Sequence, residues 1–155
     1  MNSHEYAMLA AINAARAARG LHALMADERL ADAAGRHAAD LASHPGLLHT
    51  GSDGSSIDQR IRAAGYAPAR WAEVVGWGWG GDIAPMVEWW LDSPEHIGIV
   101  LDAGMADIGV GYAQGLGPWG HYWAVDFGRP ATVAPPPPAP RPYTSYVPVV
   151  VRGEQ

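Results

Sequence analysis

The chain has 155 residues, 48% of them hydrophobic and 17% charged, a composition that predicts one globular domain with its own core and excludes a disordered chain. Its formal net charge of −6, without a Lys/Arg cluster, excludes the usual electrostatic basis for binding nucleic acid or anionic membranes. The lack of cysteine excludes disulfides and thiolate chemistry, and no apolar run is long enough to predict a transmembrane helix.

The first half of the chain predicts three helices. Ser3 can cap a first helix, whose apolar positions recur at helical spacing until a glycine stop signal. Asp27 can cap a second helix, which we expect to end near Ser43. After a Gly/Ser-rich loop, Ser56 and Gln59 have the spacing of a capping box and predict a short third helix.

The second half predicts extended segments around two further helical turns. Residues 71–79 mix aromatic, β-branched and Gly residues, which is typical of a strand or extended loop. Asp82 can cap a helix that a Ser-Pro pair ends, and the same pair can start a second short turn. Apolar alternation in residues 107–113 and 122–127 predicts an antiparallel hairpin. The expected core residues of this half are Trp90, Ile108, Val110, Trp123 and Val125.

The order of these elements predicts the fold class. Helices come first and strands last, without repeated βαβ units, so we expect an α+β fold with helices packed on an antiparallel sheet. Beyond residue 130 the composition changes to VAPPPPAPRP, which favours extended polyproline II. We therefore divide the chain into a globular domain at 3–130, a Pro-rich linker at 131–142 and a tail at 143–155, which is an edge strand or the start of a further region.

Six segments of the chain together resemble the CAP family, which comprises the SCP, antigen 5 and pathogenesis-related proteins. They occur in the family order between Tyr6 and Gly128, and they read AINAARAARGL, ADERLADAAGRHAADLA, HTGSDGSSIDQRIRAAGY, SPEHIGIVL, ADIGVGYA and HYWAVDFG. The resemblance implies a three-layer α-β-α sandwich with an antiparallel central sheet. It also implies an extracellular or cell-surface protein, although residues 1–6 carry no signal-peptide pattern.

The resemblance further implies a cleft lined by two histidines and two acidic residues, which in some members holds zinc or a similar divalent cation. His49 matches the histidine of the family's H-T-G segment, and His96 matches that of the S-P-x-H segment. Glu73 matches the glutamate of the G-E-N motif, although the triplet here reads A-E-V. The second acidic position, on a helix, is Asp92 or, as a second choice, Glu88. The expected metal ligands are His49 and His96.

The chemistry of these residue types allows two uses of such a cleft. Two neutral imidazoles with a carboxylate and water can satisfy tetrahedral zinc, whereas a histidine beside a glutamate can act as a general base without metal. The spacing of His49, Glu73 and His96 brings no pair together by itself, so we expect the fold to make them converge on one solvent-accessible cleft. His37 lies on the apolar stripe of its helix and is expected to be a core histidine. Of the seven tryptophans, Trp77 and Trp79 are candidates for a groove wall.

These observations favour a secreted or cell-wall-associated, non-enzymatic module that binds a lipid, glycan or peptide ligand in the His/Glu cleft, with a divalent cation such as zinc as its cofactor. One alternative is a metal- or His/Glu-dependent hydrolase that acts on a peptide or cell-wall component, although the chain has neither a G-x-S-x-G nor an H-E-x-x-H motif. A second alternative is a structural adhesion module displayed on the Pro-rich stalk. The fold alone does not decide among them.

Overall fold

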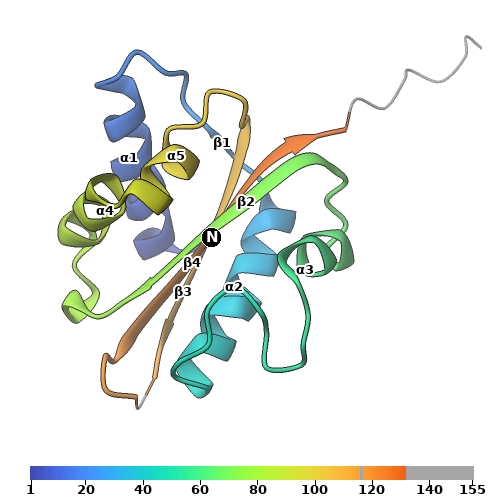
Figure 1. The fold of residues 1–155 in the computed structure, drawn as a ribbon, viewed down its shortest axis with the longest axis vertical. Helices are drawn as coiled ribbons and strands as arrows, with labels where there is room; N and C mark the ends of the chain where they lie inside the picture. The colour runs from blue at the N-terminus through green and yellow to red at the C-terminus, as the bar shows by residue number, and fades with distance from the viewer. Residues whose placement is uncertain (116, 132–155) are drawn as a thin grey trace, which may run out of the picture.

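A computed structural model of the protein describes residues 1–115 and 117–131 (Figure 1). The linker and tail predicted from the sequence lie, from residue 132 on, outside the described residues. The elements, in chain order, are α1 (Ser3–Ala17), β1 (Met25–Ala26), α2 (Glu28–Ser43), α3 (Ile57–Ala63), β2 (Pro68–Trp77), a 3₁₀ turn (Trp79–Gly81), α4 (Ile83–Asp92), α5 (Pro94–Val100), β3 (Asp107–Gln114) and β4 (His121–Pro130). No helix in the two described ranges has the length and apolar character of a membrane span.

Capping side chains explain where the helices begin. Asp27 caps α2, and Ser56 with Gln59 forms the capping box of α3, as predicted. The cap of α1 is Asn2 rather than Ser3, because a glutamate three residues after Asn2 completes a capping box there. Polar side chains that satisfy the free backbone N–H groups therefore fix these helix starts locally.

The central sheet has the strand order β1-β3-β4-β2. Strands β3 and β4 form the predicted antiparallel hairpin, and β2 pairs antiparallel with β4, with a register irregularity between Pro68 and Arg70. The short strand β1 runs parallel to β3, so the sheet is mixed and the prediction of a purely antiparallel sheet was wrong in this detail. Both residues of β1 are exposed and show no apolar alternation, which is why the sequence did not indicate a strand there.

Helices cover both faces of the sheet, in the three-layer α-β-α arrangement that was expected (Figure 1). Helices α1, α4 and α5 cover one face, and α2 and α3 cover the other. The larger apolar core lies between the sheet and the first group of helices. It contains the five residues predicted from the sequence, each with 0% of its surface exposed: Trp90, Ile108, Val110, Trp123 and Val125.

On the other face, α2 packs with its backbone directly against β3. Gly109 and Gly111 lie under this helix, and a Cβ atom on Gly111 would overlap the backbone carbonyl of Ala34. Glycine at these two positions removes the side chains that would otherwise separate helix and sheet. This close packing fixes α2 against β3 and β4, and the loop that follows the helix brings His49 to Glu73 of β2.

Candidate functional site

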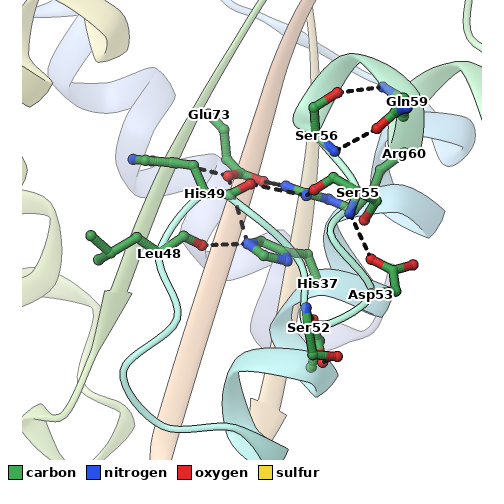
Figure 2. Close-up of polar contacts among 11 residues, drawn as sticks. His37, Leu48, His49, Ser52, Asp53, Ser55, Ser56, Gln59, Arg60 and Glu73 are labelled. Atoms are coloured by element: carbon green, nitrogen blue, oxygen red, sulfur yellow. Dashed lines mark hydrogen bonds and ion pairs between the residues drawn. The ribbon is translucent and has the colours of Figure 1, made fainter.

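Glu73, in the middle of β2, is the centre of a buried polar cluster (Figure 2). The residue is only 2% exposed, and both of its carboxylate oxygens accept hydrogen bonds. Oε1 accepts from His49 Nδ1 at 2.8 Å, and Oε2 accepts from Arg60 Nη2 at 2.7 Å. Arg60, from α3, also donates through Nη1 to the backbone carbonyls of His49 and Ser55. The cluster therefore joins the loop after α2 to both the sheet and α3.

His49 lies in the loop between α2 and α3, with its imidazole oriented by Glu73. Because a carboxylate can only accept, Nδ1 of His49 carries a hydrogen, so in the neutral ring the lone pair is on Nε2. The His49 side chain is 44% exposed, whereas the carboxylate behind it is shielded from solvent. A carboxylate that fixes the tautomer of an exposed imidazole is the arrangement found in metal-binding and general-base histidines.

His96 lies in the first turn of α5, where Nδ1 is 2.8 Å from Ser93 Oγ and the ring packs against Trp89. Burial lowers the pKa of His96, the charge of Glu95 opposes that shift, and a positive charge on His49 lowers the pKa further. Since the lowered pKa favours neutral imidazole, one ring nitrogen of His96 has a lone pair, and this nitrogen is Nε2 when Nδ1 donates to Ser93 Oγ.

The predicted helical acids lie on α4. Asp92 is its last residue, Glu88 lies one turn earlier, and both are exposed. Within the described residues, neither makes a hydrogen bond or ion pair with His49, Glu73 or His96, and no group of three or more His, Asp or Glu side chains is arranged to hold a metal ion. The assignment of Asp92 to the cleft stays a prediction. Imidazole nitrogens such as those of His49 and His96 are donors that a divalent cation like zinc accepts, and the prediction that these two share one ion stays a prediction.

Asp126 and Arg60 belong to the cluster, although sequence reasoning did not select either one. Asp126 lies directly opposite Glu73 in the β2–β4 ladder and is fully buried, and neither of its oxygens receives a hydrogen bond from an N–H or O–H group of the described chain. Burial raises the pKa of Asp126 well above the usual value; the charge of Glu73 raises it further, and Arg60 opposes the shift. This shift favours the neutral, protonated form of Asp126 over the carboxylate. The sequence signal for Asp126 was an acidic residue inside an otherwise apolar strand, which indicates a buried carboxyl group.

His37, from α2, completes the cluster. Its Nε2 donates to the backbone carbonyl of Leu48 at 2.7 Å and lies 3.7 Å from Oε1 of Glu73. Burial lowers the pKa of His37, while the charge of Glu73 raises it and that of Arg60 lowers it. The imidazole is only 1% exposed, so the expectation of a core histidine agrees with its position. It nevertheless contacts the central carboxylate.

Exposed aromatic side chains adjoin His96. Trp79 is 45% exposed and Trp89 is 41% exposed. The ring centroids of Trp79 and Trp89 are 5.8 Å apart, and those of Trp89 and His96 are 4.9 Å apart. Trp77 is only half-buried and packs against Trp119 instead. We use the name histidine face for His96, Trp79 and Trp89 together with the exposed His49.

The buried acid predicts how stability changes with pH. Because the pKa of Asp126 is higher in the folded than in the unfolded chain, its protonation stabilises the folded protein. This contribution to the free energy of unfolding is fully present below the unfolded pKa of about 3.9 and is lost as the pH rises toward the folded pKa. In that window the wild type should lose about 1.4 kcal/mol per pH unit relative to Asp126→Asn, whose amide does not ionise. Urea denaturation between pH 4 and pH 8 measures the difference. The control is Asp32→Asn, which changes an exposed residue of α2. If the free energies of unfolding of the wild type and of Asp126→Asn changed in parallel with pH, Asp126 would be ionised in the folded protein.

Three solved bacterial structures share this fold. An extracellular protein containing an SCP domain from Bacillus anthracis str. Ames is 20% identical with a TM-score of 0.74, and the match covers 83% of this chain and 41% of that chain. An outer surface protein from Borrelia burgdorferi is 22% identical with a TM-score of 0.75, and the match covers 84% of this chain and 95% of that chain. A cysteine-rich secretory protein from Staphylococcus aureus subsp. aureus Mu50 is 17% identical with a TM-score of 0.64, and the match covers 81% of this chain and 38% of that chain. The chain thus spans well under half of the Bacillus and Staphylococcus chains. These similarities define the class of fold as the SCP-type sandwich.

The family follows from the sequence match. The model of the cysteine-rich secretory protein family, CAP, matches residues 9–127. No curated protein sequence matches the chain significantly. Because the family match covers most of the chain, this protein belongs to the CAP family, and the resemblance recognised in its six segments is confirmed.

Proposed function

We propose that this protein is an extracellular or cell-surface CAP domain that binds a ligand on its histidine face without catalysing a reaction. One observation carries the proposal: the exposed imidazole of His49 is oriented by a buried carboxylate, itself held by Arg60, so that the lone pair of the neutral ring is on Nε2. Such a costly buried ion pair beneath an exposed histidine favours a recognition role for that histidine. The names of the bacterial neighbours, an extracellular protein and an outer surface protein, support the location.

A divalent cation such as zinc is part of the proposal. His49 and His96 would hold it through Nε2, because Nδ1 of each ring already makes a hydrogen bond. Glu73 would not bind the cation itself, since both of its oxygens accept hydrogen bonds from His49 and Arg60, but it orients the His49 ring. Two protein ligands are fewer than the three or four of most zinc sites, so we expect weaker binding than at a structural zinc site. The bound cation would supply a positive charge that attracts an oxygen of the ligand.

The aromatic half of the histidine face indicates the class of ligand. Trp79 and Trp89 present their rings beside His96 with about two fifths of their surface exposed. Indole rings stack on the apolar faces of sugars and also contact acyl chains. We therefore propose a lipid or glycan as the ligand, with its apolar part on the tryptophans and its polar part at the imidazoles.

The second candidate function is hydrolysis, with His49 as the general base. The carboxylate–imidazole pair favours it, since the same arrangement activates water or a hydroxyl in hydrolases. Within the described residues, however, the hydrogen bond of the His49 side chain goes to Glu73 and to no serine or threonine hydroxyl. A hydrolase here would have to activate water directly. The adhesion module stays a third reading, which predicts no ligand at all on this face.

Zinc binding tests the proposal. We expect isothermal titration of zinc at pH 7.5 to show saturable binding that weakens at least about tenfold in both His49→Ala and His96→Ala, because each variant removes one of two ligands. Binding should also disappear below about pH 6, because protonated imidazole has no lone pair. His44→Ala, which removes an exposed histidine paired with Asp40, is the matched control. Unchanged binding in both site variants would exclude the two-histidine site and leave the family assignment intact.

A further inference from the structure

Three connecting segments gather at one end of the sandwich (Figure 1). They are residues 45–47 after α2, residues 78–81 after β2, and residues 115 and 117–120 between β3 and β4, and we call them the loop end. The N–H of Gly78 donates to the carbonyl of His121 at 2.9 Å, and Pro45 lines one pocket together with Gly117. The first two segments therefore both adjoin the β3–β4 connection. The last described residue, Ala131, lies at the opposite end of β4.

The loop end exposes tryptophan side chains. Trp119 is 41% exposed and Trp79 is 45% exposed. The ring centroids of Trp119 and Trp77, the last residue of β2, are 5.3 Å apart, and Trp77 is only half-buried. Single exposed apolar residues are common on proteins, whereas several large ones gathered at one end mark an interaction surface.

The backbone holds Trp79 in an unfavourable conformation. Gly78, Gly80 and Gly81 have φ angles of +94°, +61° and +82°, which glycine adopts freely. Trp79, between them, has a φ of +49° and is the one residue other than glycine with a positive φ in the described ranges. A bulky side chain rarely occupies this left-handed region, and such outliers concentrate at functional positions. The exposed indole of Trp79 is therefore a candidate for a function of its own.

The loop end is also free of formal charge. None of residues 45–47, 78–81 and 115–120 is Asp, Glu, Lys or Arg, and the first charged residue beyond the glycines is Asp82, which caps α4. The whole chain has a net charge of −6, so its acidic groups lie elsewhere. An uncharged end can enter a poorly hydrated layer without desolvating an ion, whereas the acidic remainder is repelled by an anionic surface. These charges select a partner surface without net charge.

The inclination of the rings distinguishes a lipid surface from a polysaccharide. The ring planes of Trp77 and Trp119 are inclined by 42°, and those of Trp79 and Trp89 by 43°. Rings inclined in this way cannot all lie flat on the rigid face of an insoluble polysaccharide. The headgroup layer of a bilayer is fluid and accepts indole rings at any angle, and tryptophan is enriched at that depth in membrane proteins. The geometry therefore favours lipid.

We propose that the loop end docks onto the surface of a zwitterionic lipid bilayer, with the rings of Trp79 and Trp119 inserted at the level of the headgroups. The indole N–H stays among polar headgroups while the ring contacts the upper part of the acyl chains. This docking does not rest on the cation proposed for the histidine face, because Trp119 lies outside that face and no imidazole takes part.

Flotation with phosphatidylcholine vesicles in buffer containing EDTA tests the proposal. A single myristoyl chain gives an association constant of about 10⁴ M⁻¹, and two partly exposed rings should give about 10³ M⁻¹, so that half of the protein floats at about 1 mM lipid. The tryptophan emission should shift to shorter wavelength on binding. EDTA removes divalent cations, so a failure of the histidine face does not affect this measurement. No flotation at about 5 mM lipid, or flotation that requires anionic lipid, would overturn the proposal.

Two variants and a matched control assign the docking to the loop end. Trp119→Ser removes one inserted ring and should weaken vesicle binding at least about fivefold. Trp79→Gly should do the same, and it relieves the unfavourable backbone, so it should fold. The control is Trp71→Ser, because Trp71 is also 41% exposed but pairs with Gly128 near the other end of the sheet. Equal binding in all three variants would show that another surface docks.

Two further measurements exclude other occupants of the loop end. We expect the protein to stay in solution when it is mixed with insoluble cellulose or chitin. We also expect it to sediment as a monomer in the absence of vesicles. Retention on either polysaccharide without vesicle binding, or a dimer that Trp119→Ser abolishes, would identify a glycan or a second copy of the chain as the occupant and would overturn the proposal.

Discussion

Replacing Glu73 with alanine should lower the free energy of unfolding by about 3–5 kcal/mol, because the change leaves the buried guanidinium of Arg60 without its carboxylate. Arginine cannot release its charge by losing a proton at neutral pH, so the charge stays buried and unpaired. His49 also loses the acceptor that orients it. The loop after α2 should therefore detach from β2, and zinc binding should weaken together with stability.

Urea denaturation measures this loss, and the chain offers a matched control. Asp58→Ala removes an exposed ion pair with Arg62 on the same helix, α3, and should cost less than about 1 kcal/mol. The double variant Glu73→Ala with Arg60→Met should lose less than the sum of the single variants, because it removes the unpaired charge as well. If Glu73→Ala costs no more than Asp58→Ala, the buried cluster does not stabilise the fold.

The second large effect concerns the contact between α2 and the sheet. We expect Gly111→Ala to cost about 3 kcal/mol or more, because the added methyl group would overlap the backbone of α2 at Ala34 and Gly35. Backbone atoms cannot move aside as a flexible side chain can, so the whole helix must shift. Since α2 leads into the loop of His49, the same variant should also disturb the histidine face.

Thermal unfolding followed by circular dichroism tests this prediction. The control is Gly98→Ala in α5, where an added Cβ would meet no other atom within 4 Å. That variant should be stabilised by about 0.5–1 kcal/mol, because alanine favours the helix over glycine. A Gly111→Ala protein as stable as the wild type would show that α2 does not lie against β3 as closely as described.

Local sequence signals predicted most of the fold. The starts of α2 and α3 followed from side chains that cap a helix within three residues, and the β3–β4 hairpin followed from alternation within one segment. Strand β1 could not be predicted in the same way. Two exposed residues form it only because Asp107 and Ile108 lie beside them in the folded chain. Its parallel pairing is a tertiary effect that no local pattern records.

The site was predicted less completely, because its residues meet only through strand register. The family resemblance selected His49 and Glu73, which the structure joins by a hydrogen bond, and it also selected His96. It did not select Arg60 or Asp126. Asp126 interrupts an apolar strand just as Glu73 does, so its burial could have been suspected. That the two carboxyl groups face each other depends on the pairing of β2 with β4, which the sequence does not specify.

The edges of the sheet influence how copies of this protein behave when crowded together. An open strand edge is a template for pairing with another chain, and long flat edges lead to aggregation. In the described sheet one edge consists of β1, only two residues long, and of the part of β3 beyond Ile108, and the other is β2, whose first half has an irregular register and carries the charge of Arg70. The buried second half of β2 is shielded from neighbouring molecules. A protein built this way should stay dispersed at concentrations where a flat-edged sheet would form fibres.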